Sequence, residues 1–154
     1  MGLINQNIES LKKAEGNLEK VAQSAVRDNM DFIMFLLKEN QLGNGVLSDG
    51  RLAPKYDPST IRYAKFDTPR TGVSSKSSSN RYNFEWSGQW LDSMYIKIEK
   101  EGFDVLSRDY KTAMLEKMVK GKLTALTPKN NEKVNDEIIM PKLFDSVIDA
   151  LLYF

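Results

Sequence analysis

Apolar residues in the first forty positions recur at three-, four- and seven-residue steps, which predicts one long amphipathic helix from Leu3 to about Asn40. Between Met30 and Leu37 the helix is apolar on all sides, so this half should anchor it in the core. A continuous helix of this length spans roughly 57 Å, so its N-terminal part should project from the globule or pack on a neighbouring chain. The alternative is two shorter helices broken near Asp28. The stripe comprises Ile4, Ile8, Leu11, Leu18, Ala22, Ala25, Ile33 and Leu36.

The next stretch, Gln41–Ser93, has almost no helical pattern and is rich in glycine, proline and serine. Irregular connections beyond about 12–15 residues are uncommon in compact domains and are usually functional or disordered. We therefore expect one domain, residues 1–154. Within it, residues 42–90 should form an extended arm that binds another molecule. In the arm, Asp49-Gly50 predicts a turn. Ile61–Phe66 is either a strand or a short helical turn.

A β-hairpin is predicted where Met94–Glu99 alternates apolar and polar residues, turns through Lys100–Gly102, and continues along Phe103–Ser107. One sheet face should cover the first helix. In the core, Phe32, Ile33, Leu36 and Leu37 should then meet Ile96, Ile98 and Val105 of the hairpin and Ile148 and Leu151 near the C-terminus.

Two helices are predicted after the hairpin. Tyr110–Lys120 should turn Ala113, Met114, Leu115 and Met118 inward, with Gly121 at its C-terminal cap. Thr127-Pro128 should open the last helix, which runs to about Leu152 and is kinked at Pro141. The inward residues of the last helix should be Val134, Ile138, Leu143, Val147, Ile148 and Leu151. The predicted class is α+β: a long N-terminal helix, an irregular extended arm, a small antiparallel sheet with a β-hairpin, and two C-terminal helices.

The composition excludes several kinds of chemistry. Cysteine and histidine are absent, so disulfides, thiolate or imidazole metal ligands and histidine-based triads are excluded. No phosphate-loop, dinucleotide or calcium-loop motif occurs, and we expect no cofactor and no enzymatic activity. The alternative of an enzyme would rest on carboxylates such as Asp92, Asp104 and Asp109. A net charge of +1 does not indicate which class of partner the protein binds. No apolar run is long enough to span a membrane.

Aromatic residues in or beside the arm are candidate subunit-interface residues, because such side chains are enriched at interface hot spots. Ile4 and Ile8, on the projecting end of the first helix, are candidates for the same role. The alternative is that the aromatic residues pack on their own subunit's sheet, which we expect for Trp90 because it adjoins the hairpin. The aromatic candidates are Tyr56, Tyr82, Phe84 and Trp86.

Four cations spaced along residues 65–81 face only one acid, Asp67, and could contact phosphate. They would support a DNA-binding or packaging accessory protein as an alternative function. The simpler interpretation is a solvated loop, since no helix or aromatic platform accompanies the charges. The four candidates are Lys65, Arg70, Lys76 and Arg81.

Three runs of residues resemble, in the same order, small proteins encoded by phages and prophages of Bacteroidetes, including the crAss-like phages. The first run is Gln41-Leu42 … Gly45 … Asp49-Gly50-Arg51 … Tyr56 … Thr60. The second is Gly88 … Ser93 before the hairpin, and the third is Leu123-Thr124 … Ile139 … Pro141 … Leu143. The chain departs from that pattern in its serine-rich insert, Ser74–Ser79, and at Trp90.

The resemblance, which covers roughly residues 1–152, implies a structural component of a tailed-phage virion. Such a protein would form a ring in the neck, as a head–tail connector, or in the tail. The expected partners are further copies of itself and the portal or other neck and tail proteins, with DNA only passing through the channel and no membrane. The expected location is the virion, after synthesis in the cytoplasm of the host bacterium. No catalytic residue is implied.

Overall fold

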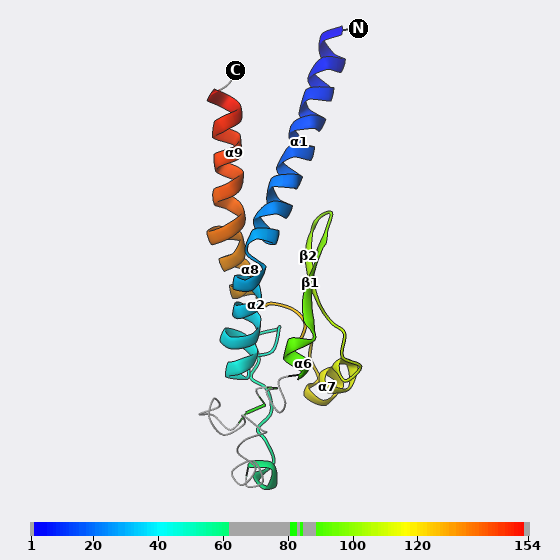
Figure 1. The fold of residues 1–154 in the computed structure, drawn as a ribbon, viewed down its shortest axis with the longest axis vertical. Helices are drawn as coiled ribbons and strands as arrows, with labels where there is room; N and C mark the ends of the chain where they lie inside the picture. The colour runs from blue at the N-terminus through cyan, green and yellow to red at the C-terminus, as the bar shows by residue number, and fades with distance from the viewer. Residues whose placement is uncertain (1, 62–80, 83, 85–88, 153–154) are drawn as a thin grey trace.

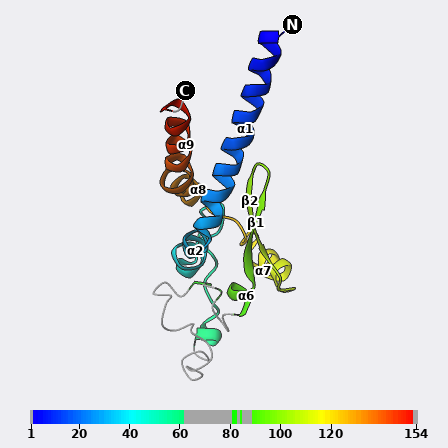
Figure 2. The ribbon, with the colours of Figure 1, turned by 45° about the horizontal axis from the view of Figure 1, so that its top comes forward.

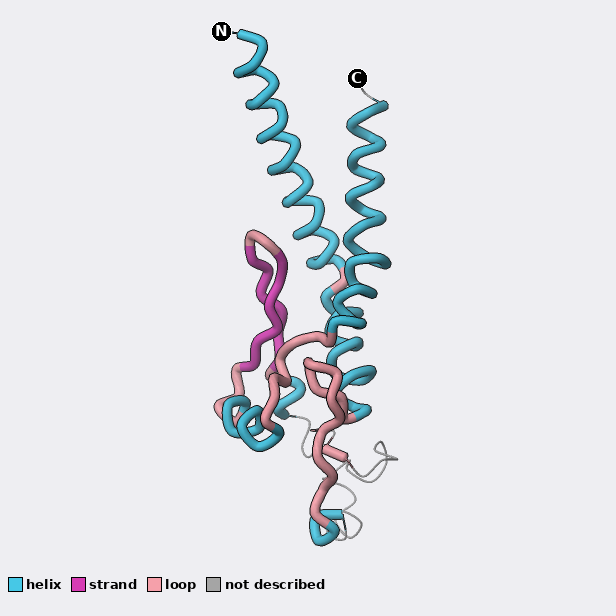
Figure 3. Tube along the Cα trace, turned by 180° about the vertical axis from the view of Figure 1, so that it is seen from behind, coloured by secondary structure: helices cyan, strands magenta, loops and turns pink. Residues whose placement is uncertain are grey.

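The computed structural model describes residues 2–61, 81–82, 84 and 89–152, with side chains from residue 13 to residue 149 of that set (Figure 1). Helix α1, Gly2–Asp28, extends past the tip of the hairpin, as predicted for its projecting half. It lies between the hairpin on one side and the last helix on the other, and the view from behind shows the same order (Figure 3). The molecule therefore has two helices, α1 and α9, that extend together from a base of short helices, loops and the hairpin. We call these two helices the stalk.

The first helical run is broken at Asn29, so the alternative of two helices is confirmed and the single continuous helix is wrong. Asn29 Nδ2 donates to the Ala25 carbonyl at 2.8 Å, and the Asn29 N–H donates to Val26 at 3.2 Å. The side chain thus satisfies a carbonyl that a continuous helix would pair with a backbone N–H. Helix α2, Met30–Phe35, begins directly afterwards.

A π-helical segment, η1 (Leu36–Gln41), and a short 3-10 turn, η2 (Leu42–Asn44), follow α2 without a gap. In an α-helix a residue five positions on is rotated by roughly 140°, whereas π winding returns it to nearly the same face. The wider winding therefore brings Gln41 under Leu36, and both are buried. Periodicity in the sequence does not reveal this change of winding.

The hairpin prediction is confirmed. Strands β1 (Met94–Glu99) and β2 (Gly102–Ser107) pair antiparallel, with Ile96 opposite Val105 and Ile98 opposite Phe103. Met94 and Val105 are buried, and Ile96, Ile98 and Phe103 pack against the core from the same face. The short helix α6, Gln89–Asp92, leads into the hairpin and buries Trp90 and Leu91.

Helix α7, Thr112–Val119, lies where it was predicted, but of its predicted inward residues only Leu115 packs against the core, and Ala113 is exposed. Met114 and Met118 are 61% and 43% exposed, while Val119 is buried and Leu115 half-buried. The cap was also misassigned, since Lys120 takes the left-handed conformation with φ 51°. Gly121 is instead needed for close approach, because a Cβ there would lie 3.2 Å from Leu47 Cδ1.

The last helical run comprises α8 (Pro128–Val134), the π-helical segment η3 (Asn135–Ile139) and α9 (Met140–Leu152). The predicted cap is confirmed, since Thr127 Oγ1 accepts a hydrogen bond from the Asn130 N–H at 3.2 Å. The proline ring at position 141 would collide with the carbonyl of Glu137 in regular α winding. The wider winding of η3 includes Glu137, so the helix accommodates Pro141 by a change of pitch.

The main apolar cluster draws on residues from α1 to the segment η3, and most of the predicted core is confirmed. Ile33, Leu36, Leu37 and Val105 are buried, with Phe32, Ile96 and Ile98 packed against them. Ile148, in contrast, is 53% exposed and Val147 41% exposed, so their predicted burial is wrong. The reason is that α9 runs beside the projecting α1 and away from the core (Figure 1).

The first part of the predicted arm packs on the core instead of extending from it. Leu42, Leu47 and Ala53 are almost fully buried. The Gly50 N–H bonds to the Leu47 carbonyl at 2.9 Å, which confirms the Asp49-Gly50 turn. Residues 58–61 form a helical turn, and the rest of Ile61–Phe66 lies outside the described residues.

The returning end of the arm lies against its beginning. Lys55 and Arg81 form an antiparallel bridge, and the Tyr82 N–H donates to Pro54 at 3.0 Å. Gly45 permits this contact, because a Cβ there would meet the Arg81 Cβ at 3.1 Å and its φ of 66° disfavours other residues. Most of the remaining arm, including Ser74–Ser79, lies outside the described residues.

Candidate interaction surfaces

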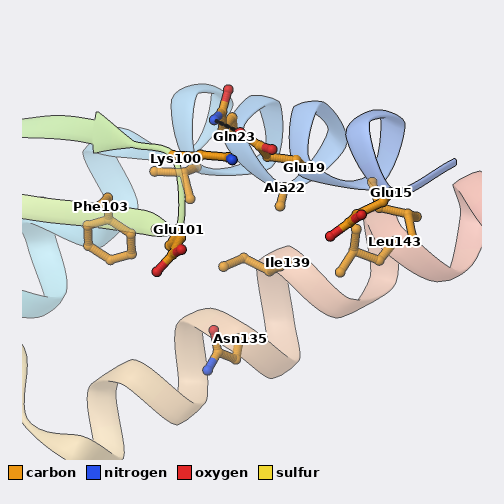
Figure 4. Close-up of a pocket in the computed structure, with 13 residues that line it drawn as sticks. Glu15, Glu19, Ala22, Gln23, Lys100, Glu101, Phe103, Asn135, Ile139 and Leu143 are labelled. Atoms are coloured by element: carbon orange, nitrogen blue, oxygen red, sulfur yellow. Dashed lines mark hydrogen bonds between the residues drawn. The ribbon is translucent and has the colours of Figure 1, made fainter. Parts of the chain in front are cut away.

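A cleft of about 650 Å³ lies between α1, the hairpin tip and the last helical run (Figure 4). Its apolar lining comes from all three elements, and four charged side chains stand at its rim. The apolar residues include Leu18, Ala22, Phe103, Ile139 and Leu143, and the charged residues are Glu15, Glu19, Lys100 and Glu101.

Gln23 lies at the edge of the cleft, where α1 meets the hairpin (Figure 4). Its Nε2 donates to Glu19 Oε1 at 3.2 Å and to the Glu99 carbonyl at 3.4 Å, which ties α1 to the hairpin turn. No group of three or more acidic side chains able to hold a metal ion occurs within the described parts of the chain. The cleft is thus a gap between three packed elements, two of which, α1 and the hairpin, are joined at its edge by Gln23.

Helix α9 carries an exposed apolar stripe next to the residues that line this cleft. Ile139 and Leu143 point toward the cleft, whereas four apolar residues further round the helix are exposed. A surface helix normally needs one apolar face, and a contiguous exposed patch marks an interaction site. We call this second face the α9 stripe: Met140 (40% exposed), Phe144 (59%), Val147 (41%) and Ile148 (53%).

A second exposed apolar row runs along α7. Tyr110, Met114 and Met118 stand at four-residue steps and are 88%, 61% and 43% exposed. We call these three residues the α7 row. Figures 1 and 2 place α7 and α9 on opposite flanks of the molecule, with α1 and the hairpin between them. The two exposed apolar rows therefore lie on different parts of the molecule.

The predicted aromatic interface residues form a ladder inside the chain. The ring centroids of Tyr56 and Tyr82 are 4.2 Å apart, those of Tyr82 and Phe84 6.3 Å, and those of Phe84 and Trp90 5.5 Å. Tyr56 and Phe84 are each 7% exposed. Tyr56, Tyr82 and Phe84 therefore pack within their own chain, which is the alternative interpretation given above. Trp86 lies outside the described residues, as do the side chains of Ile4 and Ile8.

Trp90 is intramolecular, as expected. It is 5% exposed, and its Nε1 donates to Thr112 Oγ1 at 3.0 Å. This bond links the helix before the hairpin to the helix after it. Because a buried indole N–H needs an acceptor, Thr112 fixes how α7 sits at the base of the hairpin.

Of the four candidate phosphate-contacting residues, only Arg81 belongs to the described part. Its Nη1 donates to the Ala53 carbonyl at 2.8 Å, so the guanidinium contacts the chain's own backbone. Lys65, Arg70 and Lys76 lie outside the described residues. Their phosphate contacts stay a prediction.

Sequence reasoning missed the α9 stripe and the α7 row as surfaces, although their residues were seen. Both helices are apolar over a wider arc than one packing partner covers, and this width was the available signal. From the sequence alone, a wide apolar arc predicts that more of the helix is buried. Which part of an apolar arc faces the core depends on where the neighbouring elements lie.

None of the helices in the described part of the chain combines the length and the apolar character needed to cross a bilayer. No protein-family model, curated protein or solved structure matches this chain.

Proposed function

We propose that this protein is a structural, self-assembling component of a tailed-phage virion that forms a ring in the neck or tail. The observation that carries the proposal is the pair of exposed apolar helix faces, the α9 stripe and the α7 row, on opposite flanks of one chain. A subunit in a cyclic ring presents two different surfaces, one to each neighbour. A protein that works alone has no need of either.

The projecting stalk supports the same proposal. Helix α1 extends beyond the hairpin with only α9 at its side (Figures 1 and 3). Along it, Lys13, Lys20 and Arg27 recur at seven-residue intervals and are exposed. An isolated pair of helices gains little stability without further apolar contact, so neighbouring copies would complete the packing of the stalk.

The assignment to a phage neck or tail rests on the resemblance of the runs at residues 41–60, 88–98 and 123–143 to small phage proteins of Bacteroidetes. Its expected partners are further copies of the chain and the portal or other neck and tail proteins. DNA would pass through the channel of the ring.

The test is the state of the purified protein in solution and by electron microscopy. Analytical ultracentrifugation over a hundredfold range of concentration should show a discrete oligomer, and negative-stain images should show closed rings. A protein that sediments as a monomer throughout, and that binds no portal or neck protein of the same phage, would contradict the proposal.

A further inference from the structure

An acidic side chain borders the α9 stripe. Asp145 lies beside Ile148 in the helical projection, about 60° away, whereas Asp149 lies further round the polar side of α9, next to Lys142, and all three charged residues are exposed. No ion pair joins either aspartate to another residue of the described chain. The stripe therefore has an acidic edge on the side of Asp145.

Basic side chains border the α7 row. Lys111 and Lys117 flank Met114 on its two sides in the helical projection, and Lys120 follows at the end of the helix. The Lys111 ammonium lies 5.8 Å from the centre of the Tyr110 ring, over its face. Lys117 and Lys120 are exposed. This row therefore has an apolar centre and a positive rim.

We propose that copies of this protein join head to tail by laying the α7 row of one copy on the α9 stripe of the next. The inference rests on the proposed function, and it names the two surfaces that would form the subunit contact. The partner is a second copy of this chain, because the two faces match in residue spacing and carry opposite charges at their edges.

The spacing match is specific. Met114 and Met118 on α7 are four residues apart, and Tyr110, in the turn just before the helix, continues that spacing in the sequence. Met140, Phe144 and Ile148 have the same spacing on α9, where they cover roughly 12 Å of helix at 1.5 Å per residue. Rows of this four-residue kind on two helices interdigitate at a crossing angle of about −50°, the commonest helix packing in globular proteins.

The charge match excludes the like-with-like alternative. Two α9 stripes face to face would bring Asp145 of both copies together, and two α7 rows would do the same with their lysines. Opposed edges instead place carboxylates against ammonium groups, which fixes the partner and the orientation. Because α7 and α9 lie on opposite flanks (Figure 2), repetition of the contact builds a ring where the rotation closes.

Cysteine cross-linking tests the contact directly, because the chain has no cysteine of its own. F144C and M114C variants are mixed and mildly oxidised, and denaturing gels should show a covalent dimer at least tenfold more abundant than in either variant alone. The double variant F144C/M114C should give a ladder of multimers. The matched control is F35C with M114C, because Phe35 is 53% exposed but lies on neither face.

Charge reversal supplies a second readout in the otherwise unchanged chain. D145K/D149K should shift the sedimenting species from oligomer to monomer, and adding K111E/K117E to the same chain should restore the oligomer. K13E/K20E, on the exposed side of α1, is the control and should leave the oligomer intact. Circular dichroism should show the same fold for all variants, because every substituted side chain is at least partly exposed.

The outcomes separate the two proposals. Rings that persist in D145K/D149K, with no F144C–M114C cross-link above the F35C control, would overturn this contact and leave the proposed function standing. Wild-type protein that is monomeric and binds no neck or tail protein would overturn both. Cross-linking of F144C with itself at the rate of the mixture would also overturn the head-to-tail contact.

Discussion

The backbone N–H of Thr127 donates a hydrogen bond to Gln41 Oε1 over 2.8 Å, and this bond fastens the end of the first helical run to the start of the last. Gln41 Nε2 donates in turn to the Ala125 carbonyl at 2.8 Å. Asn130 Nδ2 lies 3.3 Å from both Gln41 Oε1 and the Leu36 carbonyl. Every buried side-chain nitrogen and oxygen in the described residues has a partner. A fully satisfied polar network of this kind specifies one arrangement of its helices.

Replacing Gln41 by leucine should destabilise the fold although the side chain keeps its size. The change removes the partners of the Thr127 N–H and the Ala125 carbonyl, and each buried group left unpaired costs about 1–3 kcal/mol. Urea denaturation followed by circular dichroism measures the loss. The control is Gln89→Leu at an exposed position, which should change the free energy of unfolding by less than about 0.5 kcal/mol. Equal stability of the two variants would remove the structural role of the network.

Truncating Leu36 and Phe144 to alanine should have opposite consequences. Leu36 is fully buried in the core, so Leu36→Ala should lower the free energy of unfolding by about 2–5 kcal/mol. Phe144→Ala should leave the unfolding free energy of the isolated subunit within about 0.5 kcal/mol, yet weaken self-association. Denaturation at high dilution and sedimentation at high concentration separate the two effects. A large loss of subunit stability in Phe144→Ala would mean that the side chain is part of the core.

Replacing Lys120 by glycine should stabilise the protein. Lys120 has φ 51°, and the left-handed conformation costs a residue with a Cβ about 1–2 kcal/mol. Glycine removes that cost and adds entropy to the unfolded chain, which leaves a net gain of about 0.5–1 kcal/mol. Lys117→Gly within α7 should instead destabilise by about 1 kcal/mol. A fall in melting temperature for Lys120→Gly would show that its side chain has a role beyond the cap.

Asp49 should titrate below its ordinary pKa of 3.8. The Arg51 N–H donates to Asp49 Oδ1 at 2.9 Å, and Arg51 Nε donates to Oδ2 at 2.6 Å, so both bonds hold the pKa of the carboxyl down. Because the folded pKa is lower than the unfolded one, the contribution to stability is present above pH 3.8 and is lost as the pH falls through the folded value. The contribution should be small, since the pair is exposed. Side-chain NMR titration checks it, and a midpoint at or above 3.8 would contradict it.

Several elements follow from the sequence alone because neighbouring residues decide them. The alternation from Met94 to Glu99 and the two-residue turn after it give the hairpin and its register. Thr127 and Pro128 start the last helical run, because the hydroxyl and the proline ring act on the same turn of backbone. The Asp49-Gly50 turn is local in the same sense. In each case the residues that determine the local structure are the same residues that adopt it.

The tertiary structure decided which face of each helix is inward and how the long helical runs are wound. The apolar arc of α7 includes both Met114 and Val119, and only the packing of the helix on the core turns Val119 inward and leaves Met114 exposed. The π winding of η1 exists where Leu36 and Gln41 must both meet the start of α8. An amphipathic pattern records how much apolar surface a helix has, whereas the neighbours it packs against determine which part of that surface is buried. The exposed remainder on α7 and α9 became visible only once those neighbours were in place.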